Sequence, residues 1–224
     1  MKQLGKITLS LLKAIGFFIW SLFSFIFMES PTLAYIICDN ETRNNVNIWH
    51  HVLVLIIGCL VGFVSVYPLY KKVNGTPIWS VKLSIKNLLI SFGFTILSTL
   101  IESIIGNVLK LGSSNDNDLI RLLHTQLGAI VFFTLVISGP IFESLLFQGS
   151  LQGGIFKKLN LWLAILLTSL LFAFAHGYEL SWSTFQLFIS GLSFSLIYLI
   201  TKDIKMVIFS HGLLNLIIWI FRFF

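Results

Sequence analysis

Four polar residues lie within long apolar runs in the second half of the chain. They are Glu143, His176, His211 and Asn215. A charged side chain at the centre of a bilayer costs about 2.5–3.5 kcal/mol on insertion scales, so such groups usually face the interior of a helix bundle. A buried glutamate can act as a general base, two histidines can hold a metal or donate hydrogen bonds, and an amide can stabilise an oxyanion. Together these groups could activate a water for attack on a peptide carbonyl.

The spacing of these residues indicates how they must be assembled. His211 and Asn215 are four residues apart, which puts them on one face of a helix. No opposite charge lies within a helical turn of Glu143, so its compensation must come from other helices, most simply from the two histidines. A lone buried histidine is more often a packing residue, but the set as a whole favours a functional site.

The remaining acids and histidines are less informative. Glu29 and Glu179 fall near the ends of apolar runs, and His124 is near the start of one, where an interfacial position explains it. Glu102 lies deeper, in the segment TLIESIIG, and is an open case. It is either buried within a span or at the end of a helix that stops early.

The elements that must position these groups are membrane helices. The chain has 224 residues, a mean hydropathy of +0.92 and only 11% charged residues, against about 25% in ordinary soluble domains. A water-soluble protein could not cover its surface with so few charges. Because backbone groups in the bilayer core must be satisfied internally, long apolar runs there form helices. We therefore expect an all-α membrane helix bundle forming a single transmembrane domain over residues 1–224, with a catalytic-like core at about 120–220.

About eight transmembrane helices are expected, since a spanning helix needs about 20 mostly apolar residues. Gly139-Pro140 separates the fourth run from the fifth, and proline is favoured in the first turn of a helix. A new helix is therefore predicted to begin there, with Glu143 in its first turn. The runs are 7–28, 49–70, 84–109, 120–138, 140–156, 160–176, 183–201 and 205–223.

Basic residues cluster at the ends of these runs, which is typical of interfacial anchors and argues against nucleic acid as a partner. With eight spans and a cytoplasmic N-terminus, the positive-inside rule gives a tie. Such a tie is expected if one short run, above all 140–156, does not cross fully. Seven basic residues lie inside (Lys2, Lys6, Lys71, Lys72, Lys82, Lys86, Arg222) and seven outside (Arg43, Lys110, Arg121, Lys157, Lys158, Lys202, Lys205).

Small residues recur at the spacing that lets membrane helices approach closely. Gly58 and Gly62 form one GxxxG pattern, and Gly149 and Gly153 form another. No internal repeat and no inverted pair of broken helices is visible, although many transporters show them. These patterns favour a compact bundle.

At the four polar residues the sequence resembles the CPBP membrane proteases, which include the type II CAAX prenyl endopeptidases and the bacteriocin-processing and self-immunity proteins. That family carries EExxxR, FxxxH and HxxxN on separate helices. Here Phe172-Ala-Phe-Ala-His176 and His211-Gly-Leu-Leu-Asn215 match the second and third motifs. The first motif is degenerate, because Ser144 replaces its second glutamate and Gln148 its arginine.

The resemblance implies an intramembrane endopeptidase that acts on a membrane-associated peptide or protein tail. Glu143 would activate water, while His176, His211 and Asn215 would orient that water or hold the oxyanion. Either a metal-free site fits, or a divalent metal such as Zn²⁺ held by Glu143, His176 and His211. The expected setting is a bacterial plasma membrane crossed several times, with membrane lipid and a peptide, such as a bacteriocin, as partners. The role would be bacteriocin maturation or self-immunity.

The degenerate motif supports a second hypothesis, a catalytically inactive membrane protein that confers bacteriocin immunity by binding. The exchange of Glu and Arg for Ser144 and Gln148 leaves the net charge unchanged, so one interpretation is a structural ion pair replaced by a hydrogen bond between these two side chains. A proton-coupled carrier that uses Glu143 or Glu102 ranks last, because the repeat symmetry of such folds is missing.

Overall fold

The computed structural model describes residues 2–36, 47–108, 122, 124–176 and 181–223, and every regular element in these ranges is helical. The all-α bundle expected from the sequence is therefore confirmed. The elements are α1 (Lys2–Phe27), η1 (Ser30–Thr32), α2 (Leu33–Ile36), α3 (Ile48–Val73), α4 (Ile85–Val108), α6 (Gly128–Phe133), η2 (Thr134–Ser138), α7 (Gly139–Ser144), η3 (Leu145–Ile155), α8 (Leu161–His176), α9 (Trp182–Thr201) and α10 (Ile204–Phe223).

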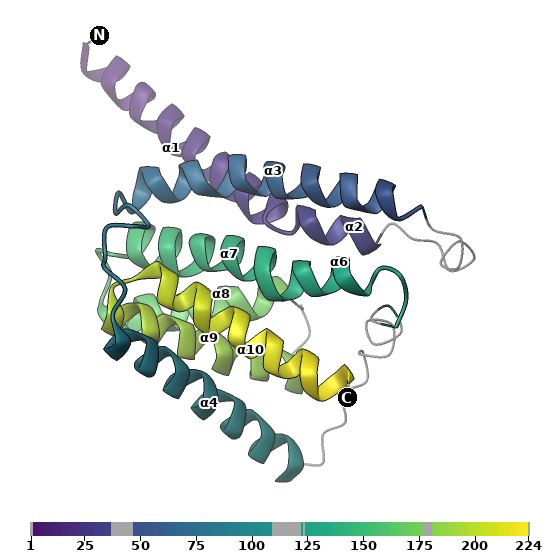
Figure 1. Ribbon diagram of the computed structural model, residues 1–224. Helices are drawn as coiled ribbons and strands as arrows, with labels where there is room; N and C mark the ends of the chain where they lie inside the picture. The colour runs from purple at the N-terminus through teal and green to yellow at the C-terminus, as the bar shows by residue number, and fades with distance from the viewer. Residues whose placement is uncertain (1, 37–46, 109–121, 123, 177–180, 224) are drawn as a thin grey trace.

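The helices stack in layers around a central helix (Figure 1). Helix α3, with α1 and α2 beside it, covers one side of the helix that runs from α6 to η3, while α8, α9 and α10 lie on its other side and α4 is outermost. The N-terminal half of α1 diverges from the bundle. The aromatic centre of the core is Phe172 of α8, whose ring meets those of Phe147 and Phe194 edge-on.

Six helices are long and apolar enough to cross a membrane by length and composition. Helix α8 is apolar but shorter, with 16 residues. The expectation of about eight spans is corrected at one place. The runs predicted at 120–138 and 140–156 form a single helical span, Gly128–Ile155, of 28 residues. Glu143 therefore lies within a long helix and not in the first turn of a new one.

A π-helical segment, η2, lets the central helix continue through Pro140. At its end the N–H of Gly139 donates to the carbonyl of Thr134, five residues back. The next bond of this pattern would join residue 140 to the Leu135 carbonyl, but proline has no N–H to donate. The side chain of Asn215 supplies the missing donor from α10, with Nδ2 2.8 Å from the Leu135 oxygen. A helix break predicted from Gly139-Pro140 alone is thus avoided by a tertiary hydrogen bond.

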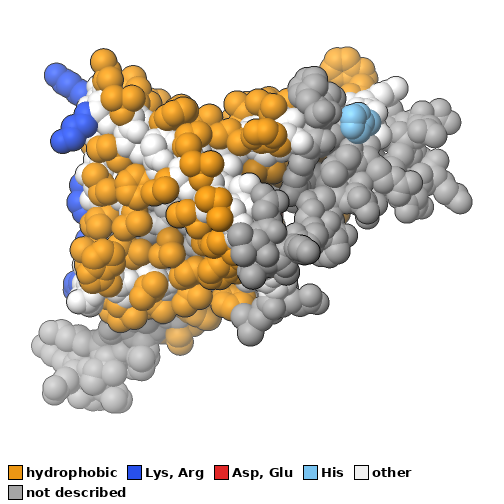
Figure 2. Space-filling model, turned by 90° about the horizontal axis from the view of Figure 1, so that it is seen from below, with side chains coloured by type: hydrophobic (Ala, Val, Ile, Leu, Met, Phe, Trp, Pro, Cys, Tyr) orange, Lys and Arg blue, Asp and Glu red, His pale blue; other side chains and the backbone are white. Residues whose placement is uncertain are grey.

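The merged span resolves the tie in the distribution of basic residues. Figure 2 shows the lysines gathered at one end of an otherwise apolar surface. Four basic residues belong to the opposite side of the membrane. Three of them, Arg43, Lys110 and Arg121, lie outside the described residues and are assigned from the order of the spans. With the single crossing, ten basic residues share the N-terminal side (Lys2, Lys6, Lys71, Lys72, Lys82, Lys86, Lys157, Lys158, Lys202, Lys205), against four (Arg43, Lys110, Arg121, Arg222) on the other.

The lysine-rich end is therefore predicted to face the cytoplasm, since basic residues near span ends favour that side. Lys158 follows η3 at this end, and Ser181 precedes α9 at the opposite end. In a background with both native cysteines replaced, a membrane-impermeant maleimide applied to intact cells should label Ser181→Cys and spare Lys158→Cys. Labelling of both positions after permeabilisation is the control. The reverse pattern would show that the orientation is inverted.

Both GxxxG motifs lie at close contacts. A Cβ on Gly58 would be 2.6 Å from the Ser30 backbone oxygen, and one on Gly62 would be 2.9 Å from the ring of Phe142. A Cβ on Gly149 would likewise be 2.6 Å from the ring of Tyr70, and one on Gly153 would meet the side chain of Tyr198 as closely. These contacts confirm the close packing expected from the two motifs.

Gly58→Ala is expected to destabilise the protein by about 1–3 kcal/mol, the range for overpacking a tight contact. The atom that the new methyl group meets belongs to the backbone of the segment after α1, so it cannot rotate away. Thermal unfolding in detergent would measure the change. Gly93→Ala is the matched control, because a Cβ at Gly93 has no atom within 4 Å. Equal unfolding temperatures for the two variants would contradict the prediction.

Candidate active site

Three of the four polar residues singled out in the sequence converge at one point. Glu143 comes from α7, His176 from the last residue of α8 and His211 from α10. The Glu143 Oε2 atom is 3.2 Å from His176 Nε2 and 3.7 Å from His211 Nε2. Both imidazoles therefore present the same ring nitrogen to one carboxylate oxygen.

Phe172 fixes both histidine rings. The His176 Nδ1 atom lies 2.9 Å from the Phe172 carbonyl oxygen, one helical turn earlier, and the carbonyl can only accept. The Phe172 ring lies 4.8 Å from the His176 ring and 5.6 Å from the His211 ring, measured between centroids. Phe194 of α9 stacks on the His211 ring with centroids 4.5 Å apart. The FxxxH spacing thus couples an orienting carbonyl to an aromatic wall.

The site is buried on one side and open on the other. Glu143 is 6% exposed and His211 3% exposed, whereas the His176 side chain is 28% exposed. Among the described residues, neither Glu143 Oε2 nor His211 Nδ1 has a hydrogen-bond partner. Polar atoms left unsatisfied at this depth are costly, and the histidine nitrogens at 3.2 and 3.7 Å are the polar groups that face Glu143 Oε2.

Asn215 lies one turn beyond His211 on α10, but its amide nitrogen is directed at the Leu135 carbonyl. The residue therefore holds α10 against the π-helical segment before Glu143. Its expected role in holding an oxyanion stays a prediction.

The interpretation of Ser144 and Gln148 as a hydrogen-bonded pair is wrong. Both residues are fully buried. The Ser144 hydroxyl and both amide atoms of Gln148 lack a hydrogen-bond partner among the described residues. The physical reason is local geometry. Ser144 is the last residue of α7 and Gln148 lies in the π-helical segment η3, so side chains four apart across this junction do not keep their α-helical alignment.

One residue at the site was missed by the sequence reasoning. Glu29 follows α1, and its carboxylate, that of Glu143 and the His176 ring each offer an atom within 4.8 Å of the others. The sequence placed Glu29 at the end of a span over 7–28, whereas the apolar helical segment continues to Ile36. The available signal was Ser30-Pro31, because a proline two residues after an acid inside an apolar segment suggests a bend within the membrane.

The open case of Glu102 is resolved by the length of its helix. α4 continues to Val108, so Glu102 lies within the span and not at its end. It is 8% exposed, and Ser190 of α9 donates a hydrogen bond to its Oε1 at 2.8 Å. Glu102 therefore belongs to the contact between α4 and α9, away from the three converging groups.

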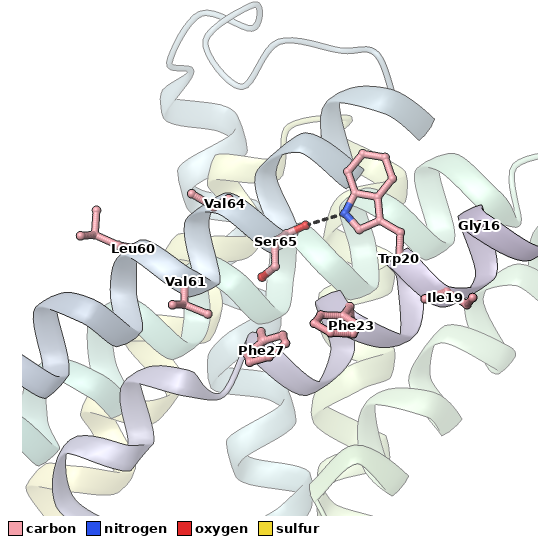
Figure 3. A pocket seen from close by; sticks show the side chains of 9 residues that line it. All are labelled: Gly16, Ile19, Trp20, Phe23, Phe27, Leu60, Val61, Val64 and Ser65. Atoms are coloured by element: carbon pink, nitrogen blue, oxygen red, sulfur yellow. Dashed lines mark hydrogen bonds between the residues drawn. The ribbon is translucent and has the colours of Figure 1, made fainter. Parts of the chain in front are cut away.

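A groove of about 590 Å³ lies between α1 and α3 (Figure 3). Its lining is almost entirely apolar and includes Phe23, Phe27 and Leu60, and the Trp20 indole N–H donates to the Ser65 carbonyl at 3.2 Å. None of the converging polar residues lines it. In a bilayer this groove faces the hydrocarbon, as the exposure of Phe23 and Leu60 indicates.

The comparison with protein families agrees with this geometry. Residues 125–217 match the family model described as type II CAAX prenyl endopeptidase Rce1-like. This segment is similar to that family and is named the Rce1-like domain for that match. The match confirms the resemblance to the CPBP membrane proteases. Comparisons with curated proteins and with solved structures gave no match.

The Rce1-like domain contains Glu143, His176, His211 and Asn215, all of which lie inside the matched residues. Glu29, which approaches the same carboxylate, lies outside it, on the first span. The protein is thus a multi-pass membrane protein whose second half is similar to a membrane-protease family, and the first span brings an acid to the same point.

Proposed function

We propose that the protein is an intramembrane endopeptidase that hydrolyses a membrane-associated peptide or protein tail. The observation that supports this most directly is the Glu143 carboxylate, buried in the Rce1-like domain with two histidine nitrogens at 3.2 and 3.7 Å. A carboxylate in that setting can remove a proton from water, and the imidazoles can donate hydrogen bonds to a developing negative charge.

The chemistry follows from these positions. Water enters beside the partly exposed His176 and gives a proton to Glu143 as its oxygen attacks the peptide carbonyl. The carbonyl oxygen becomes an oxyanion, which His211 and, in its predicted role, Asn215 stabilise. Glu143 then returns the proton to the leaving amine as the C–N bond breaks. The products are a carboxylic acid and an amine, which ionise to a carboxylate and an ammonium group, and the enzyme regains its starting state.

The biological role that fits the resemblance is maturation of a secreted peptide or self-immunity to a bacteriocin, at a bacterial plasma membrane. A second function competes with it. The buried, unpartnered Ser144 and Gln148 side chains favour a domain that has lost hydrolysis and confers immunity by binding alone.

Peptide cleavage in reconstituted vesicles tests the proposed function. Candidate bacteriocin precursors and other membrane-anchored peptides are incubated with the parent protein, and new termini are identified by mass spectrometry. Cleavage is expected with the parent protein and not with the variant in which both His176 and His211 are alanine. Glu102→Gln, which alters a buried acid away from the site, should cleave normally. Immunity without any cleavage would favour the binding function.

A further inference from the structure

Glu29 brings a second carboxylate to the Glu143 and His176 pair, and its backbone is held firmly in place. The Thr32 N–H and hydroxyl both donate to the Glu29 carbonyl oxygen, at 2.9 and 2.6 Å. The next residue, Ser30, donates from its hydroxyl to the Gly58 carbonyl on α3 at 2.7 Å. The acid is therefore carried on a bend that α3 fixes in position.

The charges at this point are unbalanced. Glu29 and Glu143 are two carboxylates within 4.8 Å of each other, and no lysine or arginine among the described residues lies within ion-pair distance of either. Like charges at this separation repel strongly where little water screens them. A positive charge at this point, from a bound cation or from added protons, is needed to keep both acids at the site.

The hydrogen bonding of His176 indicates where that charge sits. Nδ1 donates its proton to the Phe172 carbonyl, so a neutral ring would present an Nε2 lone pair. Nε2 faces Glu143 Oε2 at 3.2 Å, and either a proton on Nε2 or a metal ion can join these two atoms. Histidines that bind metals almost always donate their other ring N–H to a carbonyl or carboxylate in this way.

The distances fit a metal ion between these atoms. Ligands at about 2.1 Å in a tetrahedral site lie about 3.4 Å apart. The 3.2 and 3.7 Å separations from Glu143 Oε2 to the two histidine Nε2 atoms bracket that value. Mixed imidazole and carboxylate donors suit Zn²⁺ and neighbouring divalent transition ions.

We propose that Glu29, Glu143 and His176 bind one divalent transition-metal ion such as Zn²⁺, with His211 beside them. Two carboxylates and neutral histidines carry a net charge of −2, which one such ion balances. The degenerate motif has Ser144 in place of its second glutamate. Glu29 supplies an acid from the first span instead. That the ion carries the hydrolytic water rests on the proposed function, whereas its binding does not.

Metal titration of the purified full chain tests this inference. The protein in detergent is stripped with a chelator and titrated with Zn²⁺ by calorimetry, and with Co²⁺ by visible absorption, which reports coordination geometry. One ion per chain is expected. Glu29→Gln should weaken binding by at least about 10-fold. Glu102→Gln, which changes a membrane glutamate in the contact between α4 and α9, should leave binding unchanged.

Each outcome decides the inference separately from the proposed function. No stoichiometric binding, or equal binding by the parent protein and Glu29→Gln, would overturn it and leave a protonated His176 or a proton shared by the two acids as the compensating charge. Metal binding without cleavage would support the site and refute the peptidase. Cleavage that persists in chelator, with no metal bound, would do the opposite.

Discussion

Glu143→Gln is expected to lower kcat for peptide cleavage by about 10²–10⁴-fold, the usual contribution of a general base, while leaving KM nearly unchanged. The glutamine amide has the shape of the carboxylate but cannot accept a proton from water. In the parent protein the Glu143 Oε2 atom lies 3.2 Å from His176 Nε2. A glutamine NH₂ group in the place of Oε2 can donate a hydrogen bond to that nitrogen, so the fold should tolerate the change. The measurement is initial rates in vesicles at several peptide concentrations.

The same variant separates catalysis from binding. If the protein is a peptidase that confers immunity by cleavage, Glu143→Gln should abolish cleavage and immunity together at a normal level in the membrane. Immunity that survives in full would identify a binding protein. Glu102→Gln provides the matched comparison, because Glu102 is a similarly buried glutamate in another contact, hydrogen-bonded to Ser190.

The second large effect is expected at Asn215. Asn215→Leu keeps the side-chain volume but removes the only donor that the structure gives, within its described residues, to the Leu135 carbonyl. An unsatisfied buried carbonyl costs about 1–3 kcal/mol, and the bond also joins α10 to the segment that carries Glu143. We expect a lower unfolding temperature in detergent and, because His211 lies one turn away, a lower kcat.

A second substitution makes this prediction specific. Pro140→Ala restores an N–H at residue 140, the position that the π-helical pattern would use to satisfy Leu135. The cost of Asn215→Leu should therefore be smaller in the Pro140→Ala background, by about 1 kcal/mol, within the range for coupled neighbours. Strictly additive effects on unfolding would show that Asn215 does not replace the missing proline donor.

The late spans and the convergence of the polar groups could be anticipated, because each depends on local pattern. Apolar runs of spanning length must be helices, and Glu143, His176 and His211 have few ways to be compensated except by one another. These are consequences of the bilayer as a solvent. The convergence of the two histidines on one Glu143 oxygen follows the same reasoning.

The merged span and the role of Glu29 could not be anticipated, because each depends on contacts between distant segments. A Gly-Pro pair such as Gly139-Pro140 predicts the end of a helix. The donor from Asn215, 80 residues away in sequence, explains why this helix continues. The sequence predicts that Glu29 lies at the end of a span. Only the structure shows the bend after α1, which packs on Gly58. The predicted hydrogen bond between Ser144 and Gln148 is wrong for a local reason, because the sequence does not reveal the π-helical geometry.

The length of α8 has a consequence for the surrounding lipid. Its 16 residues extend about 24 Å at 1.5 Å per residue, against a hydrocarbon thickness of about 30 Å. This described part begins beside Lys157 and Lys158 at the lysine-rich end, and His176 is its last residue. A bilayer responds to hydrophobic mismatch by thinning. If the bilayer thins around α8, headgroups and water come closer to His176, and a substrate tail would reach the carboxylate without crossing the full hydrocarbon layer.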